Sequence, residues 1–516
     1  MKKFILLPKT FIFFLCICCL TLFNGCTTKR YMSNDKIDEN ILARKPVLVS
    51  YNQTLWILGN TTVSNDRIEG EIQPNTFAYG PRKIVKIILR NDSNLITKDN
   101  KLSVPIENIT RIEYFKYDPG KTILFSLGVA AVTAGAIGLI VYLTKESCPF
   151  VYTHNGSEYA FEGEIYSGAT NVPMERHDYL CLPNISPSDS QYLLKITNEA
   201  NEKQHTNLAE LLVIDHAPGT SVLIDKYGTA TSFSKPVSPI EAFGYDNNQV
   251  LSSITLKDNI SYSGKPQKNN QQTFDNLTLT FEKPDNAQKA QLVIRAKNSF
   301  WLDYTYGRFL NLFGNRLDSW EKKQNGKDKS EIESWCLSQG IPLSVYIEEN
   351  NQWRFIDFFN VAGPMAYKDD IMQIDLSKHN EKNIRLKLES GWLFWEIDYA
   401  GMDFSENNNL NIQRVGIDKA TDQNKKEVHE YLLFDDNQYL NQPNFNDYVL
   451  LSFPVPKMKD GDQRTVFLHS KGNYEINQKS KGAPHIAKLK KFKEARSFTR
   501  FSKENYLTAL KKYSTK

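Results

Sequence analysis

The chain has 516 residues, 41% of them hydrophobic and 24% charged, with a formal net charge of +4. This length allows two to four domains, and the composition is that of ordinary globular proteins, which excludes a mostly disordered chain. The positive charge is confined to the C-terminus, where residues 479–516 hold twelve Lys or Arg against two acidic residues.

The first residues have the pattern of a targeting segment. Lysines within the first nine residues precede an uncharged apolar run, 10–23, and Asn-Gly-Cys follows, ending at Cys26. This order is typical of a lipoprotein signal peptide over 1–25, after which Cys26 would carry the lipid. An uncleaved signal anchor or a transmembrane helix is the alternative. The polar residues 26–45 are interpreted as a tether.

Two segments of different character follow the tether. Residues 46–118 contain short β-rich runs separated by Gly, Asn and Asp, similar to small SH3-like domains, and predict a small β-barrel-like domain. Residues 119–146 predict one hydrophobic helix, because 122–144 contain no charge and no Pro and would extend about 34 Å, enough to span a bilayer core. A buried core helix is the alternative, and the side of the membrane on which the remaining chain lies is left open.

The rest of the chain is predicted to be β-rich with one helical interruption. Residues 147–298 show period-two alternation and an Asn155-Gly156 hairpin signal. Residues 299–340 carry aromatic residues at helical spacing, and 341–478 return to strands, with 384–404 similar to the closing strands of jelly rolls. The expected fold class is therefore mainly β, with a large β-sandwich region.

The most distinctive local sequence directly follows the hydrophobic segment. It contains Cys-Pro-Phe-Val-Tyr (148–152), an Asn-Gly turn, Tyr-Ala-Phe-Glu-Gly-Glu (159–164) and Glu-Arg-His-Asp-Tyr (175–179). In these motifs the chain resembles a group of uncharacterised bacterial cell-envelope lipoproteins, and the resemblance covers most of 147–478. The group has no known activity, so the resemblance implies an envelope location and no reaction.

One cluster of carboxylates is a candidate for acid–base chemistry. Glu162, Glu164, Glu175 and Asp178 lie within 17 residues, and a glycosidase could use two such groups held about 5–10 Å apart. Structural ion pairs with Arg176 are the favoured interpretation, and no catalytic residue is assigned.

A group of aromatic residues raises the question of carbohydrate binding. Trp392, Phe394 and Trp395 could form a platform on which a sugar stacks, but alternating strand positions favour a core role. The adjacent pair Asp215-His216 is interpreted as a strand end rather than a catalytic dyad.

The cysteines and histidines do not indicate a metal site or a cofactor. Once the signal is removed and Cys26 is lipidated, Cys148, Cys181 and Cys336 remain, and no histidine has metal-ligand spacing to another ligand. Cys148–Cys181 is a possible disulfide if this region is exported, whereas all three would be reduced in the cytoplasm.

The basic tail, 479–516, admits two interpretations: a solvated end, or a segment that attaches to an anionic surface. Nucleic acid is not expected as a partner for an exported protein.

Three hypotheses for function follow. The first is a non-enzymatic, membrane-anchored cell-envelope lipoprotein whose β-sandwich binds a partner or a glycan. The second is a carbohydrate-binding or carbohydrate-active protein with its site between Glu162 and Asp178. The third is a scaffold that assembles with other envelope proteins. Membrane lipid is the expected partner in the first.

Overall fold

The computed structural model divides the chain into two compact units, Met1–Thr133 and Ala134–Lys516. Each unit has its own hydrophobic core. The structure describes residues 27–32, 37, 42, 45–51, 54–64, 66–73, 85–89, 95–98, 100–117, 149–264, 272–407, 410–478 and 480–514. The protein is mainly β, as the sequence predicts.

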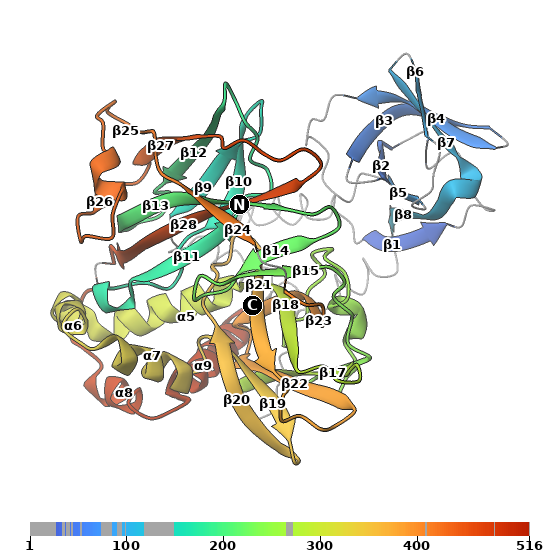
Figure 1. The fold of residues 1–516 in the computed structure, drawn as a ribbon. Coiled ribbons are helices and arrows are strands. Elements are labelled where there is room, and N and C mark those ends of the chain that lie inside the picture. Colours follow the sequence, from blue (N-terminus) through green and yellow to red (C-terminus); the bar gives the residue numbers. More distant parts are fainter. Residues whose placement is uncertain are drawn as a thin grey trace, which may run out of the picture. The chain divides into compact units, whose positions relative to one another are not determined.

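The first unit is built on one sheet with the strand order β1-β8-β5-β2-β3-β4-β7-β6 (Figure 1). Its strands are β1 (Thr27–Met32), β2 (Val47–Tyr51), β3 (Thr54–Val63), β4 (Arg67–Gln73), β5 (Val85–Leu89), β6 (Ile96–Lys98), β7 (Lys101–Pro105) and β8 (Ile109–Tyr117). Val85, Ile87 and Leu89 are buried while Lys86 is exposed, so β5 has the alternation that places one face on the core.

The start of the expected tether differs from the prediction for 26–45. Residues 27–32 form β1, which pairs with β8 from Thr27↔Tyr117 to Met32↔Ile112. Pairing satisfies the main-chain groups at the edge of β8, which a polar tether would leave exposed.

The second unit begins with a sandwich of two sheets. One has the order β10-β9-β12-β27-β25 and the other β11-β28-β13-β24, with β26 beside β13. Buried residues of both sheets, such as Leu194 and Leu211, belong to one core. The strands are β9 (Phe150–His154), β10 (Tyr159–Glu164), β11 (Arg176–Cys181), β12 (Gln191–Thr197), β13 (Glu202–His216), β24 (Asn411–Val415), β25 (Lys419–Asp422), β26 (Leu440–Gln442), β27 (Tyr448–Pro454) and β28 (Gln463–Ile476).

A second sandwich is inserted between β13 and β24. Its sheets have the orders β16-β17-β22-β19-β20 and β21-β18-β23. Leu386 and Leu388 of β22 are buried, whereas Arg385 is exposed, as the alternation predicts. The strands are β16 (Glu241–Gly244), β17 (Phe274–Glu282), β18 (Lys289–Asn298), β19 (Leu343–Glu349), β20 (Gln352–Phe359), β21 (Lys368–Asp375), β22 (Asn383–Gly391) and β23 (Trp395–Asp403).

The sheets therefore do not follow the boundaries expected for 147–298 and 341–478. Strand β13 pairs along its length with β28, and β17 pairs with β22, so each expected domain contributes strands to both sandwiches. Local alternation identifies strands but not their partners, and so the sequence pattern could not reveal the insertion.

A small hairpin joins the two sandwiches. It consists of β14 (Ser221–Ile224) and β15 (Ala230–Phe233). Leu223 packs in one buried cluster with Leu212 and Phe467 of the first sandwich and with Val293 and Ile371 of the second. The two sandwiches thus share an apolar interface.

Helices cover one side of both sandwiches (Figure 1). They are α5 (Phe300–Leu310), α6 (Leu317–Gln324), α7 (Lys329–Ser338), α8 (Ile486–Lys491) and α9 (Ser497–Ser514). The first three of these helices lie within the predicted helical range 299–340. The second unit also has 3-10 turns at Val172–Met174, Leu251–Ser253, Asn311–Arg316 and His429–Leu432, and the first unit has one at Ile106–Asn108.

The C-terminal segment is integrated into the fold, which corrects the solvated alternative for 479–516. Phe498 is fully buried and Phe492 nearly so. The indole of Trp301 donates a 2.8 Å hydrogen bond to Ser502. Burial of these aromatic side chains outweighs the preference of the neighbouring lysines for water, because the lysines remain on the exposed side of the helices.

Several predictions fall outside the described residues: the signal peptide over 1–25, the lipidation site Cys26, the hydrophobic helix over 119–146 and Cys148. Among the residues that the structure describes, no helix combines the length and apolar character needed to cross a membrane.

Candidate ligand-binding site

A cavity of about 1010 Å³ lies where the two sandwiches meet the helices. Its walls come from the loop between β10 and β11, helices α5 to α7, the loop after β20, the end of β28, and α8 with the turn that follows it. Because these segments are far apart in the sequence, the cavity exists only in the folded second unit.

One wall of the cavity is aromatic. The ring of Phe309 lies with its centroid 4.8 Å from Phe492, 5.3 Å from Phe313 and 5.9 Å from Trp335. Trp320 stacks on Phe313 at 4.3 Å. Mutual packing fixes these rings, so they form a preformed apolar surface.

Another part of the lining is the loop between β10 and β11, which is held by a buried carboxylate. Asp178 accepts hydrogen bonds from the main-chain N–H of Tyr166 at 2.6 Å and of Tyr179 at 2.9 Å, and it pairs with Lys368. Burial alone would raise the pKa of Asp178, but the charges of Lys368 and Arg176 outweigh it and lower the pKa. Arg176 also donates to the carbonyl of Val361 at 3.1 Å, which connects this loop to the second sandwich.

A buried amide fixes the loop after β20. The side-chain oxygen of Asn298, at the end of β18, accepts hydrogen bonds from Ala362 at 2.8 Å and Gly363 at 3.2 Å. Glu164 accepts a 2.8 Å bond from the main-chain N–H of Met365. Both contacts leave the loop little freedom, because its main-chain donors are already satisfied.

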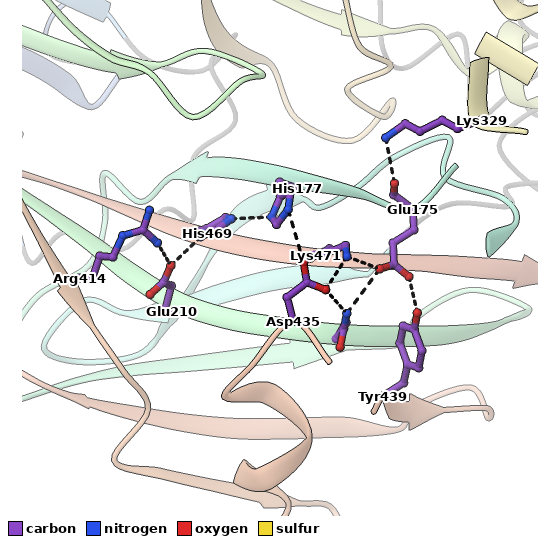
Figure 2. A network of polar contacts seen from close by, with 10 residues as sticks. Glu175, His177, Glu210, Lys329, Arg414, Asp435, Tyr439, His469 and Lys471 are labelled. Atoms are coloured by element: carbon purple, nitrogen blue, oxygen red, sulfur yellow. Dashed lines mark hydrogen bonds and ion pairs between the residues drawn. The ribbon is translucent and has the colours of Figure 1, made fainter. Parts of the chain in front are cut away.

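A polar network borders the cavity on the outer face of the β11-β28-β13 sheet (Figure 2). His177, which lines the cavity, lies 2.9 Å from His469 through Nδ1 and Nε2. His469 Nδ1 lies 2.7 Å from Glu210, which also pairs with Arg414. Tyr179 stacks on His469 at 4.6 Å, so the second imidazole is held by contacts on several sides.

The other half of the network centres on Lys471. Its ammonium lies 3.0 Å from Glu175 and also pairs with Asp435 (Figure 2). Burial would lower the pKa of Lys471, but both carboxylates outweigh this and raise it. Tyr439 donates a 2.6 Å hydrogen bond to Glu175, and His177 lies 3.8 Å from Asp435, which joins the two halves.

The electrostatics of His177 favour its neutral form. Burial lowers its pKa, and the neighbouring His469 and Lys471 lower it further, while Asp435 acts in the opposite direction. A neutral imidazole at the cavity wall can donate or accept one hydrogen bond to a ligand.

The four candidate carboxylates do not form one site. Glu162 accepts hydrogen bonds from Asn184 and Thr153, and Glu164 is bound to the loop after β20. Glu175 and Asp178 are both in ion pairs with lysines. Each carboxylate therefore has its own set of structural partners. The ion pairs of Glu175 and Asp178 are with Lys471 and Lys368, not with Arg176 as the sequence predicts.

The other candidates also take structural roles. Phe394 is fully buried, and Trp395 is 5% exposed and donates to the carbonyl of Ile341, so neither can stack on a sugar. Asp215 binds Arg464 through two hydrogen bonds of 2.6 and 2.8 Å rather than His216.

The thiols and possible metal ligands give little sign of reactivity. Burial raises the pKa of the Cys181 thiol to about 12, and it raises the pKa of Cys336, which lines the cavity, to about 12 in the same way. The pairing of Cys181 with Cys148 stays a prediction. Across the described ranges, His, Cys, Asp and Glu form no group that could hold a metal ion.

Sequence reasoning missed the cavity and the histidine pair. The two imidazoles are 292 residues apart, and the network reaches them through strands whose pairing the sequence does not reveal. One local signal was present: Glu210 interrupts the apolar run 208–214 within β13, and a carboxylate in such a position needs a partner.

Comparisons with known proteins do not define a family. No protein-family model matches the chain, and no curated protein matches it. Among solved structures, a GH31 alpha-xylosidase from Xanthomonas citri is similar over 80% of this chain and 38% of that one, with 9% sequence identity and a TM-score of 0.15. The chain thus spans well under half of that structure, and a likeness at this level supports neither a shared fold nor a shared activity.

Proposed function

We propose that this protein is a non-enzymatic cell-envelope binding protein that holds a ligand in the cavity between its sandwiches and its helices. The observation that carries the proposal is the cavity itself. Its volume of about 1010 Å³ is at the upper end for ligand sites, and fixed aromatic rings line one side of it. The ion pairs of Glu175 and Asp178 weigh against the carbohydrate-active alternative, since that mechanism needs two carboxylates facing a substrate.

Native mass spectrometry of the full chain, purified from its own envelope in a neutral detergent, tests the proposal. We expect a non-covalent mass excess that is lost in an Ile332→Trp variant, because Ile332 lines the cavity and the larger indole would fill it. The matched control is Ile240→Trp, since Ile240 is 51% exposed and lies outside the cavity lining. A mass excess of the same size in both variants would show that the ligand lies elsewhere. The absence of any mass excess in the unmodified chain would show that no ligand is bound.

The envelope location is a separate part of the proposal. It is supported by the basic and apolar N-terminus, by Cys26, and by the uncharged run 122–144, with membrane lipid as the partner. In cell fractionation we expect Cys26→Ala to lose the lipid-dependent mass and to remain in the membrane through 122–144. Recovery of this variant in the soluble fraction would show that 122–144 does not anchor the chain. An unchanged lipid mass would show that Cys26 does not carry the lipid.

A further inference from the structure

We infer that the ligand of this cavity is an anionic amphiphile, a molecule with one apolar chain and one carboxylate or phosphate head. The inference rests on the proposed binding role and specifies its chemistry. Two features of the lining carry it: the aromatic wall and an excess of positive charge beside it.

The apolar part of the ligand is defined by the aromatic wall. The rings of Phe309, Phe313 and Phe492 are at most 8% exposed and pack on one another. Trp320 and Trp335 extend this surface and are themselves only partly buried. A surface of this kind gains free energy when an apolar chain displaces water from it, but it offers few partners for the many hydroxyl groups of a sugar.

The head group is defined by the charge of the lining. Among the described residues that line the cavity, six are Lys or Arg and three are Asp or Glu. Lys226 pairs with Asp357, and Lys327 pairs with Glu331, so these two cations are already neutralised by carboxylates.

The remaining positive charge includes two lysines in one short segment. Lys490 and Lys493 both line the cavity and are exposed, and within the described ranges neither has an ion-pair partner. Phe492, between them in the sequence, is buried against Phe309. An amphiphile whose chain lies on the rings therefore places its head where these two ammonium groups can reach it.

Photo-crosslinking of the full chain in neutral-detergent micelles tests the inference. The probes are a diazirine-bearing hexadecanoic acid, the corresponding hexadecyl phosphate, and the uncharged hexadecanol. We expect both anionic probes to label peptides that contain α5, α6, α7 or α8. Hexadecanol should label the same peptides at least fivefold less, since a charged head forms ion pairs with lysine that an alcohol cannot form. Comparison of the two anionic probes shows which head is preferred.

Charge reversal at the cavity supplies the matched control. Lys490→Glu with Lys493→Glu should reduce labelling by the acid about fivefold or more, whereas Lys488→Glu with Lys491→Glu should leave it unchanged. All four lysines are exposed, but Lys488 and Lys491 lie outside the lining, and both pairs change the net charge equally.

Two results would overturn the inference: equal labelling by the acid and the alcohol, or equal losses in the two double variants. If the mass excess in native mass spectrometry is still lost in Ile332→Trp, the binding role stands and only the chemical class of the ligand is wrong. If that mass excess is absent from the start, the binding role itself fails.

Discussion

The 2.9 Å hydrogen bond between His177 and His469 requires one imidazole to donate and the other to accept. It is lost when both rings are protonated. Because His177 lines the cavity, its protonation state affects both the fold and the site. The groups that act on the pKa of His177 are His469, Lys471, Asp435 and Lys329.

Stability should therefore fall as the medium becomes acidic. The pKa of His177 is lowered in the folded state, so the unfolded chain binds more protons between that value and the usual 6.5. Its contribution to stability is full above pH 6.5 and is lost as the pH falls through the folded pKa. We expect the urea midpoint to drop between about pH 7.5 and pH 5, and to drop less in His177→Gln. Equal drops in the two proteins would assign the effect to other groups.

The contacts of single residues were only partly predictable. A structural ion pair for Asp178 could be expected from the charges around it, but its partner is Lys368, which is 190 residues away. Arg176, two residues before Asp178, instead donates to main-chain carbonyls. Sequence proximity could not identify the partner, because Lys368 begins β21 of the inserted sandwich, and the sequence pattern does not reveal where that strand lies in the fold.

For the helices, too, the sequence predicts local structure better than packing against distant residues. Aromatic residues at helical spacing correctly indicated helices within 299–340. The C-terminal segment has the same signal in Ile486, Leu489, Phe492 and Ala495, but its twelve basic residues left a solvated end and a surface-attached segment equally open. The structure shows that this segment is part of the fold, because the start of α9 contacts residues that are distant in the sequence. The N–H of Phe498 donates to Gln339 at 2.8 Å, and Phe394 packs on Phe498.

This packing predicts a large effect for one truncation. Phe498→Ala removes a fully buried ring, which typically costs about 3–5 kcal/mol because a cavity remains. Phe445→Ala is the control, since Phe445 is 64% exposed and should change stability by about 0.5 kcal/mol or less. Urea unfolding followed by tryptophan fluorescence compares them. Similar midpoints would mean that α9 does not contribute to the folded state in solution.

At the level of the complete chain, the two units differ in how far the sequence defines them. The core of the first unit draws its described residues from 32 to 114, so most of it falls within the expected range 46–118, whereas Met32 and Leu42 come from the expected tether. Within the second unit the first sandwich is discontinuous in sequence: β12 pairs with β27 and β13 with β28, on either side of the inserted sandwich. The sequence predicts the strands of both sandwiches, but not this topology and therefore not the cavity that depends on it.

The insertion has a consequence for the order of assembly. Asp215 and Arg464, which face each other on β13 and β28, are 249 residues apart. During synthesis β13 therefore emerges long before its partner, and its apolar edge stays unpaired while the entire second sandwich is made. Contacts at such separation are slow to form and leave strand edges exposed to other chains. Throughout this interval the unpaired edge of β13 can associate with other chains, and the exposure ends only when β28 has been made and can pair with it.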